Sequence, residues 1–408
     1  MDLKEQNMTT QVAPQRVAQR ITSPEQALET AHRLAEQFSP TAAERDSQRR
    51  LPVAELADLF ASGLGAITVP QEFGGPGLSN RVLAQVIAIL SQGDASIGQV
   101  PQNHYYALEV LRVNGSPQQQ RRLYQEVLAG VHFGNALAEF ASKAAHHRST
   151  SLARHEGQWQ LSGQKFYATG ALYAGRIPTA ARGEDGKEQL VFLPRNTPGL
   201  SITDDWSGFG QRTTGSGSVT LEQCPVDEED IVPFQTAFER PTPVGPLAQI
   251  MHAAIDQGIA KAAWQDMLQF VRSRSRPWID AGVEHASEDP LTLDRIGKIS
   301  ARIQAGDALL AVAGEAIDVA QRHSDALSVA QASIEVATAR AWTTEVALAA
   351  GNLLFELAGS RATLQEYNLD RHWRNARTHT LHDPVRWKYP AIGNYVLNGV
   401  LPPRRGTL

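Results

Sequence analysis

The sequence of 408 residues holds a single cysteine, Cys224, and no long apolar run. A lone cysteine excludes an internal disulfide and a cluster of metal-binding thiolates, and it is typical of a reducing compartment. No segment approaches the ~18 consecutive apolar residues that a membrane span requires. The first 20 residues are polar and lack the apolar centre of a secretory signal. We therefore expect a cytoplasmic protein with a loose tail at residues 1–20.

An excess of positive charge is also missing. The chain has 38 Lys and Arg against 43 Asp and Glu, which gives a formal net charge of -5. Such a balance provides no basic field for wrapping nucleic acid, although local arginine clusters can still bind a small phosphate. A small molecule is therefore the expected partner, with no role for nucleic acid or a membrane.

Several sequence motifs that are typical of common catalytic sites are absent. No G-x-G-x-x-G follows a predicted strand, and the glycine-rich segment at 210–216 has no Walker lysine. Neither H-E-x-x-H nor G-x-S-x-G occurs. The sequence thus gives no support for the common dinucleotide fold, a phosphate-binding loop, a zinc protease or a serine hydrolase, and we predict no metal site.

Apolar periodicity divides the chain into three parts. Residues 21–130 show helical spacing, with a capping signal at Ser23-Pro24-Glu25-Gln26 and a predicted helix over 96–113. Residues 131–240 contain short alternating runs interrupted by glycine, which predict an antiparallel β domain; in it, 159–167 is expected to form two strands around a Ser-Gly turn. Long alanine-rich helical stripes return over 241–408. Because strands and helices do not alternate, a parallel α/β sheet is excluded and an α+β multidomain fold is predicted.

Histidine and arginine are concentrated near the end of the chain. Residues 371–384 contain three histidines, three arginines and an aspartate. Pro384 disfavours a helical conformation at Asp383, so His382 and Asp383 are expected on a turn at a helix end. An imidazole there has an ordinary pKa of about 6.5 and suits proton transfer near neutrality. From this stretch alone, simple capping of helix carbonyls by these side chains is the better supported interpretation.

Other segments carry a family resemblance. Val-Pro-Gln-Glu-Phe-Gly-Gly at 69–75, Asp-Ala-Ser-Ile at 94–97 and the segment 161–170 resemble the acyl-CoA dehydrogenase superfamily over nearly the whole chain. The segments 204–218, 276–278 and 373–384 are similar to its flavin-dependent monooxygenase branch, which acts on dibenzothiophene and in sulfone-linked sulfur acquisition. The resemblance implies an N-terminal α-helical domain (21–130), a middle antiparallel β domain (131–240) and a C-terminal four-helix bundle (241–408). It also implies a homotetramer.

The resemblance assigns roles around a flavin. Tyr167 and Thr169 match positions that place a ring and a hydroxyl against the flavin, near N5. Asn135 matches a position beside the reactive face, and Trp206 one that packs against the ring. His382, oriented by Asp383, matches the site of the catalytic base.

Further positions match a substrate pocket and a phosphate site. Gln99 and Asn103, with His104 alongside, replace the histidine and tyrosine of the dibenzothiophene enzyme, which argues against the same bulky substrate. Arg276, with Arg361 from a neighbouring subunit, replaces the elements that hold the ADP half of FAD. A guanidinium fork suits a terminal phosphate, so FMN is the predicted cofactor.

Together these matches predict a two-component monooxygenase. Reduced FMN from a separate NAD(P)H:flavin reductase would react with dioxygen through a flavin C4a-(hydro)peroxide and oxygenate a small sulfone or sulfoxide in sulfur acquisition. Thr169 and Asn135 would polarise the flavin edge. Two alternatives remain open: an FAD-dependent acyl-CoA dehydrogenase, and a flavin-binding member without turnover. Against the dehydrogenase, this chain lacks the glutamate that acts as base in that class, because His382 and Asp383 occupy the usual C-terminal position.

Overall fold

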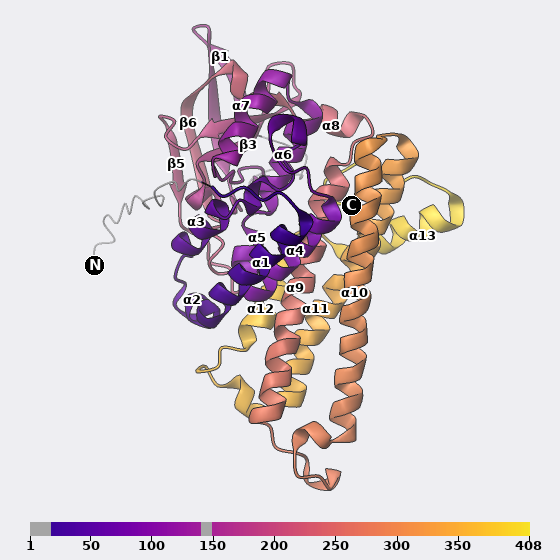
Figure 1. Ribbon diagram of the computed structural model, residues 1–408. Helices are drawn as coiled ribbons and strands as arrows, with labels where there is room; N and C mark the ends of the chain where they lie inside the picture. Colours follow the sequence, from indigo (N-terminus) through magenta and orange to yellow (C-terminus); the bar gives the residue numbers. More distant parts are fainter. Residues whose placement is uncertain (1–17, 140–148) are drawn as a thin grey trace, which may run out of the picture.

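The computed structural model describes residues 18–139 and 149–408. It contains N-terminal helices, a β sheet and a bundle of long C-terminal helices, in that order along the chain (Figure 1). The predicted fold class is therefore confirmed. Residues 1–17 of the predicted tail lie outside the described residues.

The N-terminal helices begin where polar caps occur. Ser23 accepts a hydrogen bond from the backbone of Gln26, and Ser116 forms a full capping box with Gln119. The predicted helix over 96–113 is instead two helices, because Pro101 lacks the amide hydrogen needed in a helix interior. The helices are α1 (Pro24–Phe38), α2 (Ala42–Gln48), α3 (Val53–Ala61), α4 (Asn80–Gly93), α5 (Ala95–Gln99), α6 (Gln102–Asn114) and α7 (Pro117–Leu128).

The sheet has seven strands in the order β5-β6-β2-β1-β3-β4-β7. Its neighbours pair antiparallel except β1 and β3, which run parallel, so the prediction of a purely antiparallel domain is corrected to a mixed sheet. The strands are β1 (Ser151–His155), β2 (Gln158–Lys165), β3 (Arg176–Arg182), β4 (Glu188–Pro194), β5 (Leu200–Thr203), β6 (Ser218–Val226) and β7 (Ile231–Pro233).

The predicted Ser-Gly turn at 162–163 does not exist, because β2 runs through it. Gly163 has φ of 150° and marks an irregular register between β2 and β6. A side-chain carbon at this position would lie 2.6 Å from the Thr150 hydroxyl, which explains the glycine. The hairpin turns instead at Glu156 and Gly157, whose positive φ values of 51° and 84° match the twist of the two strands.

The C-terminal bundle is built from long helices. In α10 (Pro290–Arg322) the apolar side chains of Ile299, Ile303, Leu310 and Ile317 are buried, whereas Leu293 is 54% exposed. None of the helices in the described residues is long and apolar enough to cross a lipid bilayer. The helices of this part are α8 (Thr236–Glu239), α9 (Val244–Ser273), α10 (Pro290–Arg322), α11 (Ala326–Ala358), α12 (Asp370–His379) and α13 (Lys388–Asn398).

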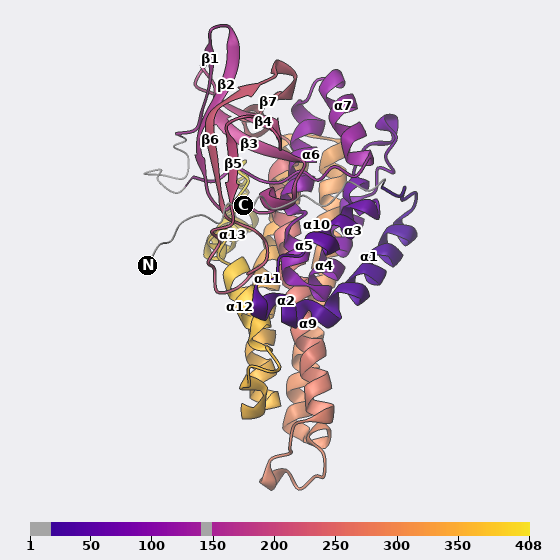
Figure 2. The ribbon, with the colours of Figure 1, turned by 90° about the vertical axis from the view of Figure 1, so that its left-hand side faces the viewer.

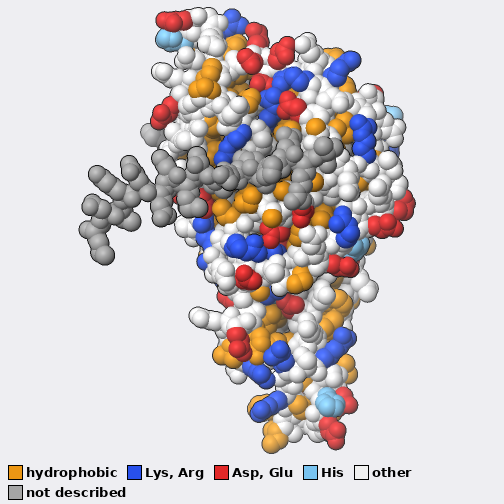
Figure 3. Space-filling model, turned by 60° about the vertical axis from the view of Figure 1, so that its left-hand side comes forward, with side chains coloured by type: hydrophobic (Ala, Val, Ile, Leu, Met, Phe, Trp, Pro, Cys, Tyr) orange, Lys and Arg blue, Asp and Glu red, His pale blue; other side chains and the backbone are white. Residues whose placement is uncertain are grey.

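The sheet lies at one end of the molecule, and the lower parts of α9, α10 and α11 extend away from it (Figures 1 and 2). The N-terminal helices pack beside the upper part of the bundle. Acidic and basic side chains are interspersed on the face drawn in Figure 3, and no basic stripe crosses it. The segment 204–217, which joins β5 to β6, reaches α12 and brings the sheet and the bundle together.

Candidate active site

The turn after α12 carries His382, as the position of Pro384 predicts. Nδ1 of His382 lies 2.8 Å from the carbonyl oxygen of His379. A carbonyl oxygen only accepts, so Nδ1 carries the hydrogen and Nε2 keeps its lone pair. The side-chain amide of Gln99 donates to that Nε2 over 3.1 Å. These two contacts fix a neutral imidazole with one defined tautomer.

The surroundings of His382 favour its neutral form. Its pKa is lowered from the usual value, first because protein displaces water around the charged form and also because Arg340 is close. As a whole residue His382 is nevertheless exposed in the isolated chain, so it lies where a ligand can approach. An accessible neutral imidazole is suited to accept a proton near neutrality.

Asp383 does not orient His382, which corrects the expectation from the sequence. Its carboxylate accepts a hydrogen bond from Nζ of Lys388 over 2.7 Å and lies 3.6 Å from the guanidinium of Arg340. Lys388 is 1% exposed, and a buried ammonium group requires a charged partner. Asp383 is therefore committed to Lys388, and the backbone carbonyl of His379 orients the imidazole in its place.

On the sheet side, three hydroxyl groups form a hydrogen-bonded chain. Oγ1 of Thr214 donates to the carbonyl oxygen of Gln211 over 3.0 Å. Oγ of Ser216 lies 2.7 Å from the hydroxyls of both Thr214 and Thr169. Each hydroxyl has one hydrogen, so all three bonds form only if Thr169 donates to Ser216 and Ser216 donates to Thr214. The oxygen of Thr169 is then left as an acceptor.

Asn135, Tyr167 and Trp206 lie together beside Thr169. Tyr167 is 50% exposed and has a φ of 53°, an unusual conformation for an aromatic residue. The amide of Asn135 donates to the Tyr167 carbonyl over 3.1 Å, which supports that conformation. The ring of Trp206 packs edge-on against Tyr167 with centroids 6.1 Å apart, and its Nε1 donates to the Gln211 carbonyl over 2.8 Å. The structure thus groups the predicted flavin-facing residues of the β domain.

Gln211 connects this group to the helical side. Its backbone amide donates to Oδ1 of Asn375 in α12 over 2.7 Å, and its side-chain oxygen lies 3.1 Å from the Ser96 hydroxyl in α5. In addition, a side-chain carbon at Gly170 would lie 3.2 Å from Val100. Gly170 follows Thr169, and Val100 follows Gln99. The hydroxyl chain that ends at Thr169 therefore lies close to Gln99, the residue that contacts His382.

The three predicted pocket residues have different environments. Gln99 contacts His382, and its Oε1 is buried without a hydrogen-bond partner in the described part of the chain. Asn103 is half-buried. His104 is fully buried, bound through Nε2 to the Gly65 carbonyl at 2.8 Å and through Nδ1 to the Phe133 amide at 3.1 Å. His104 is therefore a core residue, and its assignment to the substrate pocket is corrected.

Arg276 and Arg361 are not brought to Thr169 by their own chain. Both are exposed: Arg276 follows α9, and Arg361 lies in the 3-10 helix Ser360–Thr363 after α11. The hydroxyl of Ser275 donates to the Leu357 carbonyl over 3.3 Å, so the two segments meet. That end of the bundle lies opposite the sheet (Figures 1 and 2). A neighbouring chain has to supply these arginines if they bind the cofactor phosphate.

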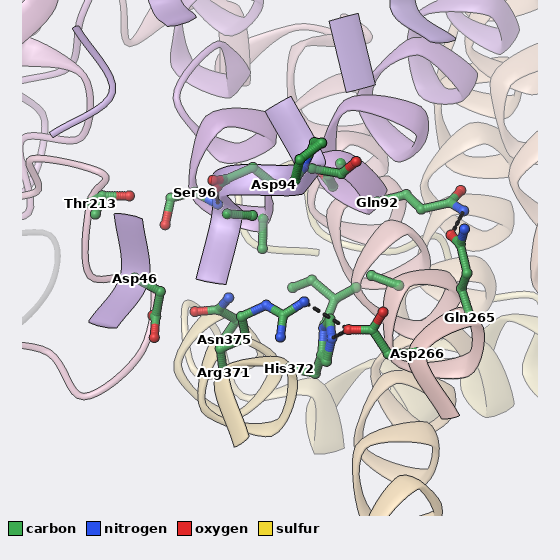
Figure 4. A pocket seen from close by; sticks show the side chains of 18 of the residues that line it. Asp46, Gln92, Asp94, Ser96, Thr213, Gln265, Asp266, Arg371, His372 and Asn375 are labelled. Carbon is green, nitrogen blue, oxygen red and sulfur yellow. Dashed lines mark hydrogen bonds and ion pairs between the residues drawn. The ribbon is translucent and has the colours of Figure 1, made fainter. Parts of the chain in front are cut away.

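A polar pocket of about 260 Å³ lies between α4, α9 and α12 (Figure 4). Asp266 accepts hydrogen bonds from Arg371 and His372, each over 2.7 Å. Burial would raise the pKa of Asp266, but the hydrogen bond from His372 and the charges of His372 and Arg371 lower it to about 2. These charges satisfy one another, so this half of the His- and Arg-rich segment is structural.

Two imidazoles beside His382 were not assigned to the site from the sequence, although His379 lies in the His- and Arg-rich segment 371–384. His252 and His379 have ring centroids 4.8 Å from that of His382, and Asp256 in α9 binds His379. The available signal was the pair His252 and Asp256, four residues apart in the first half of α9, where they share one face.

This histidine cluster does not have the spacing of a metal site. The candidate nitrogens of His252, His379 and His382 spread over as much as 4.8 Å. An ion bound at about 2.0–2.1 Å can bridge nitrogens no more than about 4.2 Å apart. Hydrogen bonds to Asp256, to Gln99, to the His379 carbonyl and between two of the rings occupy these ring nitrogens except Nε2 of His252.

Comparisons with known proteins identify the family of this chain. Residues 23–131 match the N-terminal domain of acyl-CoA dehydrogenase, and residues 250–387 match its C-terminal domain. The chain is 32% identical to a probable FMNH2-dependent monooxygenase, SfnC, of Pseudomonas putida, over 93% of this chain and 97% of that one. The chain belongs to the flavin-dependent monooxygenase branch of the acyl-CoA dehydrogenase superfamily.

Solved structures agree with this family. FMN-bound TdsC of Paenibacillus sp. A11-2, a dibenzothiophene monooxygenase, superimposes with a TM-score of 0.89 at 28% identity, covering 94% of this enzyme and 100% of TdsC. Methanesulfinate monooxygenase MsuC of Pseudomonas fluorescens gives a TM-score of 0.87 at 30% identity, covering 95% and 100%. The family and enzyme class predicted from the sequence are thereby confirmed.

Proposed function

We propose that this enzyme is the oxygenase of a two-component system. It uses FMNH2 from a separate NAD(P)H:flavin reductase and dioxygen to oxygenate a small organosulfur compound, with a sulfone or sulfoxide as the expected class. The observation that carries the proposal is the neutral imidazole of His382, fixed by the His379 carbonyl and Gln99. The names of SfnC, TdsC and MsuC support FMN as cofactor and a sulfur compound as substrate.

The residues present fit reduced FMN. When bound, reduced FMN supplies the two electrons that activate dioxygen. The hydroxyl chain leaves Thr169 as an acceptor, which suits the N–H that a reduced flavin carries at N5 and an oxidised flavin lacks. Tyr167 and Trp206 supply aromatic surface for the ring, and Arg276 with Arg361 of a neighbouring chain would bind the phosphate.

The protein contributes proton handling and positioning. His382 can accept or return a proton at Nε2, where Gln99 now donates. Asn135 holds the Tyr167 carbonyl, and the Gln211 contacts keep the sheet side aligned with α12.

The dehydrogenase alternative lacks an available base. The carboxylate of Asp383 is bound to Lys388. Asp256 is fully buried and accepts from Arg340, from Thr344 over 2.9 Å and from His379 over 2.5 Å. Neither carboxylate is free to remove a proton from an acyl thioester.

Oligomerisation is part of the proposal. Apolar side chains remain exposed along α10 and α13, including Leu291, Val319, Val396 and Leu397. Exposed apolar side chains of this kind support an interface between chains. A homotetramer would cover these residues and would also place the Arg276 end of one chain next to the flavin of another.

Rapid mixing tests the proposal directly. Enzyme saturated with reduced FMN is mixed with oxygen, with and without each member of a panel of small sulfones, sulfoxides and sulfinates. We expect delayed reappearance of oxidised FMN, little hydrogen peroxide, and an oxygenated product with one panel member. His382→Gln should keep FMN affinity but release peroxide.

Two results would replace the proposal. Purification with bound FAD that an acyl-CoA bleaches would establish a dehydrogenase. Reoxidation of FMN at the same rate with and without the protein, despite measurable binding, would establish a flavin-binding protein without turnover.

A further inference from the structure

Behind His382, a chain of hydrogen bonds runs through three buried groups. Oδ1 of Asp256 lies 2.5 Å from Nδ1 of His379. Nε2 of His379 in turn lies 3.1 Å from Nδ1 of His252. Asp256 and His379 are 0% exposed and His252 is 8% exposed. The chain therefore connects the protein interior to a ring at the edge of the site.

The partners of Asp256 decide where the hydrogens lie. Arg340 and the Thr344 hydroxyl both donate to Asp256, so its carboxylate is ionised and accepts from Nδ1 of His379. A neutral His379 then accepts at Nε2, and His252 must be the donor through Nδ1. The free end of the chain is Nε2 of His252, which has no hydrogen-bond partner among the described residues.

The electrostatics allow the chain to hold a proton only briefly. Four charged groups face it: Asp256 from α9, Arg340 from α11, Asp383 from the turn and Lys388 from α13. Two negative and two positive charges cancel, so an added proton makes the buried cluster net positive. Burial lowers the pKa of His252 and His379 well below the usual value, and the neighbouring histidines and Arg340 lower it further.

We propose that His252, His379 and Asp256 form a proton-transfer chain that serves His382, an inference that rests on the proposed function. A proton from the pocket binds Nε2 of His252, and the Nδ1 proton of that ring moves to Nε2 of His379. One N–H bond forms and one breaks at His252, while one forms at His379. The positive charge ends on His379, where Asp256 stabilises it, and the reverse steps return the proton.

This arrangement suits monooxygenation, in which the second oxygen atom leaves as water. A proton set aside early in the reaction has to be returned when water forms. The ring of His252 lies 4.8 Å from that of His382, so transfer between the pocket and the chain needs only a small rearrangement or one water. Asp256 touches no reacting atom and is a positioning residue, which fixes the tautomer of His379 as an aspartate does in a catalytic triad.

The hydrogen positions are measurable without flavin. Solid-state NMR of flavin-free enzyme labelled with 15N-histidine distinguishes Nδ1–H from Nε2–H rings, and single variants assign the signals among the 12 histidines. We expect Nδ1–H for His252, His379 and His382, and a strongly hydrogen-bonded proton on His379. Finding Nε2–H on His379 in the unaltered enzyme would overturn the proposal.

Kinetics give the second test. Asp256→Asn lets an amide donate to His379 and should turn its tautomer, while His252→Gln removes the outer ring. Each should lower kcat by about 10²-fold or more, with KM little changed, because general acid–base catalysis contributes about 10²- to 10⁴-fold. His372→Gln is the matched control, since it also removes a buried histidine that binds an aspartate, but at the polar pocket between α4, α9 and α12. Its kcat should stay within about threefold.

The outcomes separate this proposal from the proposed function. If Asp256→Asn fails to fold because Arg340 loses its partner, His252→Gln and the NMR measurement decide. Full kcat in a folded His252→Gln enzyme would refute the chain. If the unaltered enzyme oxygenates no sulfur compound, the proposed function fails, whereas the tautomers of flavin-free protein still test the hydrogen-bonded chain.

Discussion

Thr169→Val should weaken the binding of reduced FMN more than the binding of oxidised FMN. In the structure the Thr169 hydrogen is used by Ser216, so its oxygen can only accept. Reduced flavin offers a hydrogen at N5, and oxidised flavin offers a lone pair that gains nothing from this oxygen. Valine keeps the shape of a side chain that is 4% exposed, so packing changes little. The variant also removes the bond from Thr169 to Ser216, but that bond is lost with both flavin states, so the ratio of the two dissociation constants reports the bond to the flavin.

The expected size follows from that bond. A single intramolecular hydrogen bond contributes about 0.5–1.5 kcal/mol net, which changes the ratio of the two dissociation constants by about 2- to 13-fold. Kd for oxidised FMN is measured by flavin fluorescence quenching, and Kd for reduced FMN by the same titration under anaerobic conditions. Thr169→Ser is the matched control, since it retains the hydroxyl and should preserve the ratio.

A second variant makes the reasoning refutable. Ser216→Ala removes the acceptor of the Thr169 hydrogen, so the hydroxyl becomes free to donate to oxidised flavin. The preference for reduced FMN should then fall, although Thr169 is intact. Equal changes in both dissociation constants for Thr169→Val, or no change in the ratio for Ser216→Ala, would show that the hydroxyl chain does not discriminate between flavin states.

Four further predictions follow from other contacts. Asp266→Asn should lower the free energy of unfolding by about 2 kcal/mol, because a pKa of about 2 in place of 3.8 corresponds to roughly that amount. The stabilisation is present above pH ~4 and is lost as the pH falls through about 2. Urea unfolding at several pH values would check both expectations. Because the pKa of His382 is lowered, the neutral ring should persist below pH 6.5, so the acidic limb of kcat should lie below that value and disappear in His382→Gln. Arg276→Ala should raise the Kd for FMN about tenfold, as expected for losing a charge-assisted hydrogen bond, whereas Arg274→Ala should not, by equilibrium dialysis. If the proposed homotetramer forms, Leu397→Glu, at a side chain 83% exposed in one chain, should lower the mass seen in sedimentation experiments; an unchanged mass would exclude α13 from the interface.

Features decided by nearby residues could be predicted from the sequence. Ser116 caps α7 and Pro384 sets the turn of His382, because a hydroxyl or a proline ring acts on the adjacent backbone. The Ser-Gly pair at 162–163 gave a wrong prediction, because its local preference for a turn was overridden when β2 paired with two neighbouring strands.

The site was predictable only in part, because its details depend on groups distant in sequence. His104 looks like a pocket residue until Gly65 and Phe133 occupy both of its nitrogens. In the sequence Asp383 looks like the partner of His382, but in the structure its carboxylate accepts a hydrogen bond from the buried ammonium group of Lys388. Such pairings depend on which charges the fold buries together, and no spacing within one segment reveals them.

The segment 204–217 sets a limit on engineering this enzyme for new compounds. A side-chain carbon at Gly210 would lie 2.0 Å from the Arg374 carbonyl oxygen, and the amide of Gln211 is already bound to Asn375. Random libraries that vary this segment would consist mostly of chains in which the two halves of the site are displaced. Asn103, which is half-buried and has no part in the contacts that fix His382, is the better position for diversity, because changing it leaves that alignment and the Gln99 contact with His382 untouched.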